Sequence, residues 1–227
     1  MLSADNFRTL LDGAQLTVYV TALAVAWGTV VAVVLGVASL SAPTPVRWAV
    51  RVYVEVLRGV SAIILIFWVY YALPLLGVEF SAMQAAVLAL GLNLSAYGAE
   101  IVRGAVQAVP RGQSEAAVAI NLSSGQRLWS IVLPQAVVGM LPPYGNLLIE
   151  VMKASSLVSL ISLADLTREA QNLRQLRAAD SVSIFTAVLI IYFAISLGIT
   201  GIIRLLERRF GRGLETGRMG SRAATAK

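Results

Sequence analysis

Acidic and basic side chains stand three positions apart at three places in the chain, and these are the groups that could recognise a charged solute. The pairs are Glu55 with Arg58, Glu100 with Arg103, and Glu150 with Lys153. Residues at this spacing share one face of an α-helix, so the two charges of each pair can partly neutralise each other. The chain contains no histidine and no cysteine, which excludes disulfides, thiol or histidine catalysis and the commonest transition-metal sites. We therefore expect no catalysis at these positions, and no metal and no cofactor.

The elements that must position these pairs are long apolar segments. Five runs lack Asp, Glu, Lys and Arg, and each has the roughly 20 residues that a helix needs to cross a membrane. They are 13–46, 59–78, 80–99, 128–149 and 181–203. Hydrophobic residues make up 58% of the 227 positions and charged residues only 13%, which is too apolar for one soluble core. The sequence predicts an all-α, polytopic membrane protein with five transmembrane helices.

The distribution of basic residues predicts how these spans are oriented. Thirteen of the 18 Lys and Arg residues follow the first, third or fifth run, on one side of the membrane. The positive-inside rule then puts the N-terminus, residues 1–12, outside and the C-terminus in the cytoplasm of a cell with an inner membrane. We expect the polar tail 211–227 to be disordered. The net charge of +6 fits cytoplasmic loops of a membrane protein better than nucleic-acid binding, which we do not expect.

This orientation makes residues 100–127 the one substantial cytoplasmic loop between spans. Residues 115–120 are alanine-rich and predict a short helix, which Gly112 could cap and which 123–125 would end. A second helix is expected to begin near residue 126 and to continue into the fourth span. Small side chains on the short helix would let another protein approach closely. Glu115 alone has a simpler explanation, the favourable position of a carboxylate near a helix N-terminus.

The segment resembles the EAA loop of bacterial ABC-importer permeases, in which this loop forms the coupling helix that docks on the ATPase subunit. The matching residues are Gly112, Glu115, Ala116, Ala117, Gly125, Leu133 and Pro134. The resemblance implies a type I importer permease of MetI-like fold over residues 13–210, with its coupling loop at about 104–127. It also implies three partners besides the lipid membrane: a cytoplasmic ATP-binding subunit, an extracytoplasmic solute-binding protein, and a second permease chain, either a copy of itself or a sister subunit.

Further stretches resemble the permeases for polar amino acids within that family. They are 97–104, 112–117, 133–136, 141–143 and 153–157. One departure stands at the start of the second span, where the family usually has Arg-Gly-Thr-Pro and this chain has Arg58-Gly-Val-Ser61. That form, together with residues 67–77, is most similar to permeases for ectoine and hydroxyectoine, with an ordinary polar amino acid as the alternative substrate.

The chain has no phosphate-binding loop of its own, which requires a Gly-Lys-Ser or Gly-Lys-Thr sequence. Its two lysines are Lys153, followed by alanine, and Lys227, the last residue. An ATP-driven importer built from this chain would therefore take its motor from another subunit, and we expect the chain itself not to be an enzyme.

Substrate chemistry is expected in the fourth span. Pro142 and Pro143 should interrupt this helix, and broken helices at membrane depth are tolerated where they line a cavity. The apolar run 155–163 covers only about half a span and suggests a re-entrant or interfacial segment. Candidates for the translocation path or its gate are Glu100, Arg103, Glu150, Lys153, Ser155 and Ser156. For the first two acid–base pairs, 55/58 and 100/103, a structural or docking role is favoured over contact with the substrate. The last four candidates could equally mark the outer membrane interface.

Three other functions remain open on the residues alone. An ion-coupled secondary transporter commonly has more spans and inverted repeats, neither of which is visible here. A membrane enzyme would need clustered catalytic groups, and no paired carboxylates occur within the spans. A non-transporting structural subunit is the third possibility, and association with a soluble ATPase would separate it from a permease.

Overall fold

A computed structural model describes residues 4–211, and within them the chain is helical apart from short connections. The α-helices are α1 (Ala4–Ser41), α2 (Thr44–Gly59), α3 (Ala62–Phe67), α4 (Ala82–Gln107), α5 (Arg111–Ala119), α6 (Ser124–Arg127), α7 (Leu133–Ala154), α8 (Leu166–Leu176) and α9 (Ser181–Gly211). Two π-helical segments, Trp68–Ala72 and Leu128–Val132, and three 3₁₀ segments, Leu73–Leu76, Ser155–Ile161 and Ala178–Asp180, link or extend them. No strand occurs among the described residues. The predicted disordered tail lies outside them except for residue 211.

Four helical segments of the described chain are long and apolar enough to cross a membrane, at 5–41, 82–107, 124–161 and 178–211. A fifth candidate is a bent pair, in which Thr44–Gly59 and Ala62–Leu76 meet at 103°. The five predicted spans are therefore present as four long helices and one pair. The run 59–78 is not the expected single helix, because it forms only the second arm of the bend and passes through π- and 3₁₀-helical turns.

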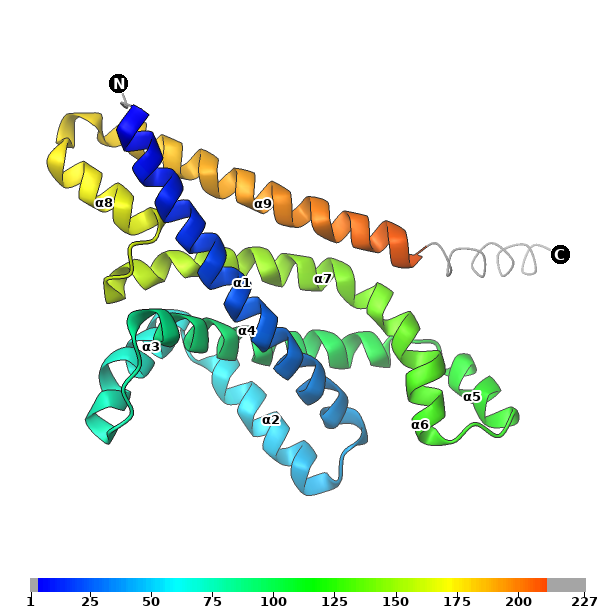
Figure 1. The fold of residues 1–227 in the computed structure, drawn as a ribbon. Helices are drawn as coiled ribbons and strands as arrows, with labels where there is room; N and C mark the ends of the chain where they lie inside the picture. The colour runs from blue at the N-terminus through cyan, green and yellow to red at the C-terminus, as the bar shows by residue number, and fades with distance from the viewer. Residues whose placement is uncertain (1–3, 212–227) are drawn as a thin grey trace.

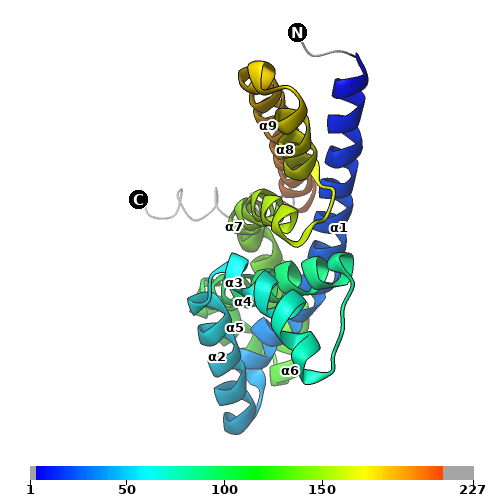
Figure 2. The same cartoon turned by 90° about the vertical axis from the view of Figure 1, so that its left-hand side faces the viewer.

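The arrangement separates the two ends of the molecule (Figure 1). Helix α1 crosses α7 and α4 diagonally, and the start of α1 lies at the same end as α8. The last turn of α9 lies at the opposite end, on the side where α5 and α6 project from the bundle. Figure 2 shows the same division, with α8 near the N-terminal end of α1 and with α2, α5 and α6 at the other end. The loop that carries the EAA-like residues is thus far from α8.

Helix α1 approaches α4 closely because glycines face the contact. A Cβ on Gly91 would overlap the indole of Trp27, and a Cβ on Gly28 would lie 2.8 Å from the Gly91 carbonyl oxygen. The Trp27 indole nitrogen donates a 3.1 Å hydrogen bond to the carbonyl of Val87. Small residues let helix backbones come together where there is no water to drive apolar association. The α1–α4 contact fixes the position of α4, which carries Tyr97, Glu100 and Arg103.

The first turns of α1 also contact the connection before α8. A Cβ on Gly13 would lie 2.9 Å from the Cα atom of Leu166. The hydroxyl of Thr17 accepts a 3.2 Å hydrogen bond from the Leu166 backbone N–H. Helix α1 is therefore attached to α8 at one end, while near its other end Ser39 lines a cavity beside α2.

The expected break in the fourth span is absent. Pro142 and Pro143 lie inside α7, which runs without interruption from Leu133 to Ala154. Each proline removes one backbone donor and crowds the carbonyl four residues earlier, but a long helix can absorb this by bending. For Pro143 that residue is Gly139, which has open space around the position of a Cβ. The run after Lys153 is also not a separate re-entrant segment, because it continues the span as a 3₁₀ helix with Val158 and Ile161 buried in the core.

The prediction of a short helix between the third and fourth spans is confirmed in outline and wrong in its caps. The short helix α5 begins at Arg111 after Pro110, so Gly112 lies inside it rather than capping it. Proline is already fixed near the φ that a helix start requires. The helix ends at Ala119, and Asn121 turns the chain with a φ of 58°. The expected terminator 123–125 instead starts α6, where Ser123 and Gln126 form a capping box.

Candidate functional site

Three cavities follow one another along α4, and Arg58 lines all of them. The α2–α4 cavity has about 580 Å³ and lies between the ends of α1, α2 and α4. The second, of about 420 Å³ and here called the Ser61 cavity, lies between Ser61, Asn93 and Ala154. The third, of about 400 Å³ and called the Asn146 cavity, lies between α2, α4 and α7. Arg58 therefore stands where the three spaces meet.

Arg58 is held in this place by Tyr97. The helix α2 ends at Gly59, so Arg58 belongs to its last turn and its backbone carbonyl is free to accept a bond from outside the helix. The Tyr97 hydroxyl donates to that carbonyl oxygen at 3.2 Å. The Arg58 guanidinium carbon lies 5.3 Å from the centre of the Tyr97 ring, within the range of a cation–π contact.

The Asn146 cavity brings together charged groups from three helices. Arg58 from α2, Glu100 from α4 and Glu150 from α7 line it, together with the Tyr97 phenol and the Asn146 amide. Glu150 also lines the Ser61 cavity, and within residues 4–211 it makes no ion pair or hydrogen bond. A guanidinium can bind a carboxylate through two parallel hydrogen bonds, and a carboxylate can bind a cation. The site can thus receive a small solute that carries both charges.

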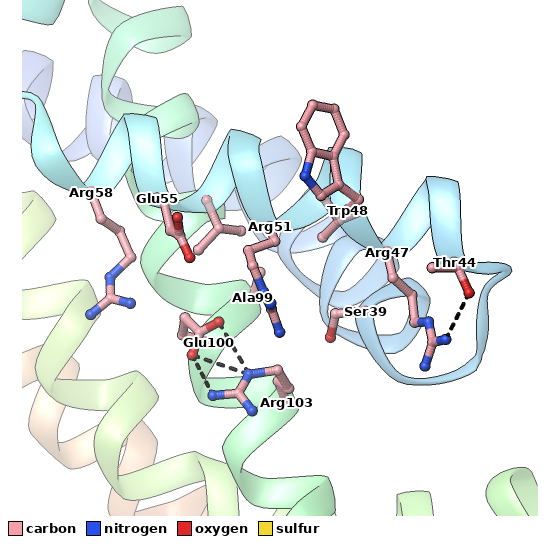
Figure 3. A pocket seen from close by; sticks show the side chains of 12 residues that line it. Ser39, Thr44, Arg47, Trp48, Arg51, Glu55, Arg58, Ala99, Glu100 and Arg103 are labelled. Carbon is pink, nitrogen blue, oxygen red and sulfur yellow. Dashed lines mark hydrogen bonds and ion pairs between the residues drawn. The ribbon is translucent and has the colours of Figure 1, made fainter.

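Glu100 and Arg103 form an ion pair in the structure. The Arg103 Nε atom donates to both Glu100 oxygens at 3.1 Å, and a terminal guanidinium nitrogen donates to Glu100 Oε2 at 2.7 Å. Figure 3 shows this pair across the α2–α4 cavity from Arg51 and Arg58. Glu100 is therefore largely neutralised by its own helix, whereas Glu150 is not. Glu150 and Lys153 form no corresponding pair in the described part of the chain, although their spacing permits one.

The other candidates on the fourth span do not line these cavities. Lys153 is exposed, and the Ser156 hydroxyl donates to its backbone carbonyl at 2.8 Å. Ser155 is fully buried, and its hydroxyl donates to the carbonyl of Met152 at 2.6 Å. The structure places Glu100, Arg103 and Glu150 around the cavities, and it places Lys153, Ser155 and Ser156 beyond them, near the end of the span.

The site takes residues from several helices, which spacing along one helix does not reveal. That spacing pairs Arg58 with Glu55 and does not select Asn146. The signal for Asn146 was available, because it stands four positions before Glu150 and so on the same face of α7. Two further polar residues of α4 make bonds between helices, Tyr97 to the Arg58 carbonyl and Ser95 to the Tyr53 hydroxyl at 2.7 Å. Asn93 and Tyr97 line the Ser61 cavity.

The residues of the EAA-like segment form a separate region at one end of the molecule (Figure 1). Glu115 and Ala116 are exposed on α5, as are Gly112 and, at the start of α6, Gly125. Ala117 is buried, Leu133 is partly buried and Pro134 is exposed. The Gln135 side-chain nitrogen donates to Gln113 Oε1 at 3.3 Å, which connects α5 directly to the start of α7. A displacement of α5 can therefore reach the helix that carries Glu150.

Asp165 is the notable charged group at the opposite end. Its carboxylate begins α8 by accepting the backbone N–H groups of Thr167 at 3.2 Å and Arg168 at 3.0 Å. The side chain is fully buried, and this burial raises the pKa of Asp165 to about 6 in spite of the two hydrogen bonds. Asp165 therefore stabilises the first turn of α8, but burial of its carboxyl group disfavours the charged form.

A family model described as binding-protein-dependent transport system inner membrane component matches residues 18–212. The chain is 44% identical over 209 residues to a probable amino-acid ABC transporter permease protein, y4tF, of Sinorhizobium fredii, covering 89% of this chain and 87% of that protein. It is 35% identical over 204 residues to the glutamine transport system permease protein GlnP of Escherichia coli, covering 88% of this chain and 92% of the other.

Solved structures agree with these sequence relationships. An amino acid ABC transporter crystallised with histidines superposes with a TM-score of 0.82 at 32% identity, covering 89% of this chain and 94% of that one. The inward-facing methionine ABC transporter MetNI superposes with a TM-score of 0.79 at 20% identity, over 92% of this chain and 99% of the other, a likeness of fold.

Proposed function

The chain belongs to the family of binding-protein-dependent transport system inner membrane components, and we propose that it carries a zwitterionic, amino-acid-like solute as the permease subunit of an ABC importer. It has the MetI-like fold of type I importer permeases and is a multi-pass protein of the inner membrane. Its relatives are permease proteins, so the chain is a transport subunit rather than an enzyme by itself.

The charges around the Asn146 cavity carry the proposal on substrate class. Arg58 provides a site for a carboxylate, and Glu150 provides one for an ammonium or amidinium group. The cavity volume of about 400 Å³ lies in the range of small-molecule sites. Relatives named for amino-acid and glutamine transport support the same class. A zwitterion would satisfy both signs of charge without leaving either unpaired in the membrane.

Within this class we propose ectoine or hydroxyectoine, with a polar amino acid as the alternative. The proposal rests on the resemblance of Arg58-Gly-Val-Ser61 and residues 67–77 to permeases for these compatible solutes. Ser61, the position at which the chain departs from the common family pattern, lines the Ser61 cavity together with Arg58. In this proposal the side chain at position 61 contacts the solute, so a substitution there would change a direct contact.

The resemblance to EAA-loop permeases and the distribution of basic residues also suggest where the other parts of the importer lie. The ATP-binding subunit docks on α5 through Glu115 and Ala116, within a coupling loop at about 104–127 of a transmembrane domain at 13–210. The solute-binding protein docks at the end that carries α8. A second permease chain, a copy or a sister subunit, completes the path. In this assignment the N-terminus is outside and the end of α9 is in the cytoplasm.

Uptake by the reconstituted importer tests the proposal. Proteoliposomes with the second permease chain, the ATP-binding subunit and the solute-binding protein would be supplied with labelled ectoine, glutamine, arginine or glutamate. We expect ATP-dependent uptake of one of these, with KM raised tenfold or more by Arg58→Gln and by Glu150→Gln, since a charge-assisted hydrogen bond contributes about 1.5–3 kcal/mol. Arg204→Gln and Glu79→Gln change the same charges at exposed positions away from the cavities and should leave KM unchanged. Uptake that follows an ion gradient without ATP would contradict the proposal.

A further inference from the structure

The charged residues of α2 form one stripe along the helix. Arg47, Arg51, Glu55 and Arg58 are separated by four, four and three positions, a spacing that keeps them on the same face. Thr44, three positions before Arg47, extends this stripe. All of these residues line the α2–α4 cavity (Figure 3). Val50 and Val54 lie on the buried side of α2, packed with Ala99 of α4. The helix therefore packs through its valines and presents its charges to the cavity.

The arginines in this cavity outnumber the acids that could neutralise them. Arg47, Arg51, Arg58 and Arg103 face two glutamates, Glu55 and Glu100. The charge of Glu100 is already taken by Arg103 through three hydrogen bonds. Arg47 donates only to the Thr44 hydroxyl, at 3.2 Å. Within residues 4–211, the side chain of Arg51 makes no hydrogen bond and no ion pair. Arg51 and Arg58 interact with the Glu100 charge only at longer range, so the cavity holds guanidinium groups with no carboxylate within ion-pair distance.

We propose that the α2–α4 cavity is a second binding site for the carboxylate group of the transported solute, which reaches it from Arg58. This inference rests on the proposed function and adds Arg51 and Arg47 to the residues that contact the solute. Arg58 lines both the Asn146 cavity and the α2–α4 cavity. A carboxylate released by Arg58 can therefore bind next to Arg51, two helical turns away on the same stripe.

The chemistry of the second cavity repeats that of the first. Glu55 stands four positions after Arg51 on the same face of α2, so the carboxylate and the cationic group of a zwitterion would both find a partner. A phosphate group would carry more negative charge into a space that already contains Glu55 and Glu100. Both considerations favour a monocarboxylate over a phosphate as the ligand.

The absence of cysteine from the chain permits a direct test. A single cysteine is introduced at the cavity as Thr44→Cys, and in a second variant as Ser39→Cys, in the complete importer in lipid nanodiscs, where both membrane faces are accessible. The rate of labelling by a cationic thiol reagent is measured with L-glutamine, L-arginine or ectoine, and with the carboxyl methyl ester of each. We expect one of the three acids to slow labelling about tenfold when its concentration is about ten times its Kd, because about a tenth of the sites are then unoccupied. The esters should have no effect.

Arg51→Gln should abolish this protection, whereas Arg204→Gln, an exposed charge at the end of α9, should leave it intact. Labelling that none of the three acids slows in either cysteine variant would overturn the inference, as would equal protection by an ester or by inorganic phosphate. Uptake is measured on the same preparations. A complex that imports solute but shows no protection contradicts the second site alone, and a complex that shows no ATP-dependent uptake contradicts the proposed function.

Discussion

Tyr97 holds Arg58 through both its hydroxyl and its ring. The phenol donates a 3.2 Å hydrogen bond to the Arg58 carbonyl oxygen, and the guanidinium carbon lies 5.3 Å from the ring centre. The first contact fixes the last turn of α2 against α4, and the second orients the side chain. One residue of α4 thus determines where the shared guanidinium of three cavities stands.

Substitutions at Tyr97 should separate these two effects. Tyr97→Phe removes only the hydrogen bond, worth about 0.5–1.5 kcal/mol, and we expect KM for uptake to rise about threefold to tenfold. Tyr97→Leu also removes the cation–π contact, about 0.5–2 kcal/mol more, and should raise KM further. Transport kinetics in proteoliposomes measure both values. A Leu variant that matches the Phe variant would show that the ring does not position Arg58.

The α1–α4 contact should not tolerate a methyl group at Gly91. Gly91→Ala would displace the Trp27 indole and break its bond to Val87, and we expect a loss of about 1–3 kcal/mol through overpacking. Gly104→Ala, on the same helix but with open space around it, is the matched control and should change stability by no more than about 1 kcal/mol. Thermal unfolding of the purified protein in detergent measures the difference. Equal melting temperatures for the two variants would contradict the packing described here.

Asp165 should make the protein's stability depend on pH. Its pKa is raised to about 6 from an ordinary 3.8, so the folded state holds the proton more tightly than the unfolded state. The contribution of this proton to the free energy of unfolding is therefore complete below about pH 4 and is lost as the pH rises through about 6. It amounts to at most about 3 kcal/mol. Asp165→Asn keeps an oxygen that can cap α8 but cannot ionise, so its stability should not fall over this range.

The matched variant Asp165→Ala removes the cap as well. We expect it to be less stable than Asp165→Asn by about 1 kcal/mol at every pH, because two backbone N–H groups lose their acceptor. Melting temperatures between pH 4 and pH 7 measure both effects. If the melting temperatures of the wild type and the Asn variant change with pH in the same way across this range, the carboxyl of Asp165 does not hold a proton in the folded protein.

Adjacent alanines on α5 should respond differently to a bulky side chain. Ala116 is exposed, so Ala116→Trp should leave folding intact while it prevents co-purification of the ATP-binding subunit. Ala117 is only 3% exposed, so Ala117→Trp should lower the melting temperature of the permease itself. Pull-down with the ATP-binding subunit and thermal unfolding together distinguish docking from stability. Unchanged ATPase binding by the Ala116 variant would place the docking surface elsewhere.

The fold could be predicted from the sequence where length and polarity decide it. Charge-free runs indicated the spans, and the alanine-rich stretch 115–120 indicated the projecting helix α5. They could not reveal the 103° bend between α2 and the segment after Ala62, because hydrophobicity measures how much of a chain is apolar and not its direction. Pro142 and Pro143 suggested a break because proline is judged by local rules, whereas α7 stays continuous within a long helix.

The candidate site was harder to predict because it is built between helices. Spacing along one helix identified the Glu100–Arg103 pair, which the structure contains. The same rule paired Glu55 with Arg58 and so concealed the contact of Arg58 with Tyr97, 39 positions away. Which charged residues face a common space depends on how α2, α4 and α7 pack, and a single sequence does not carry that information in its periodicity.

The length of α1 has a mechanical consequence. Its 38 residues form a rod of roughly 57 Å. At one end Gly13 lies against the backbone of Leu166, and at the other Ser39 forms part of the wall of the α2–α4 cavity. A stiff lever of this kind converts a small rotation into a larger displacement at its far end: a tilt of roughly 5° about Gly13 moves Ser39 by roughly 3 Å. An event at α8 can thus change the width of a space near the other end of α1 without any change within the helix itself.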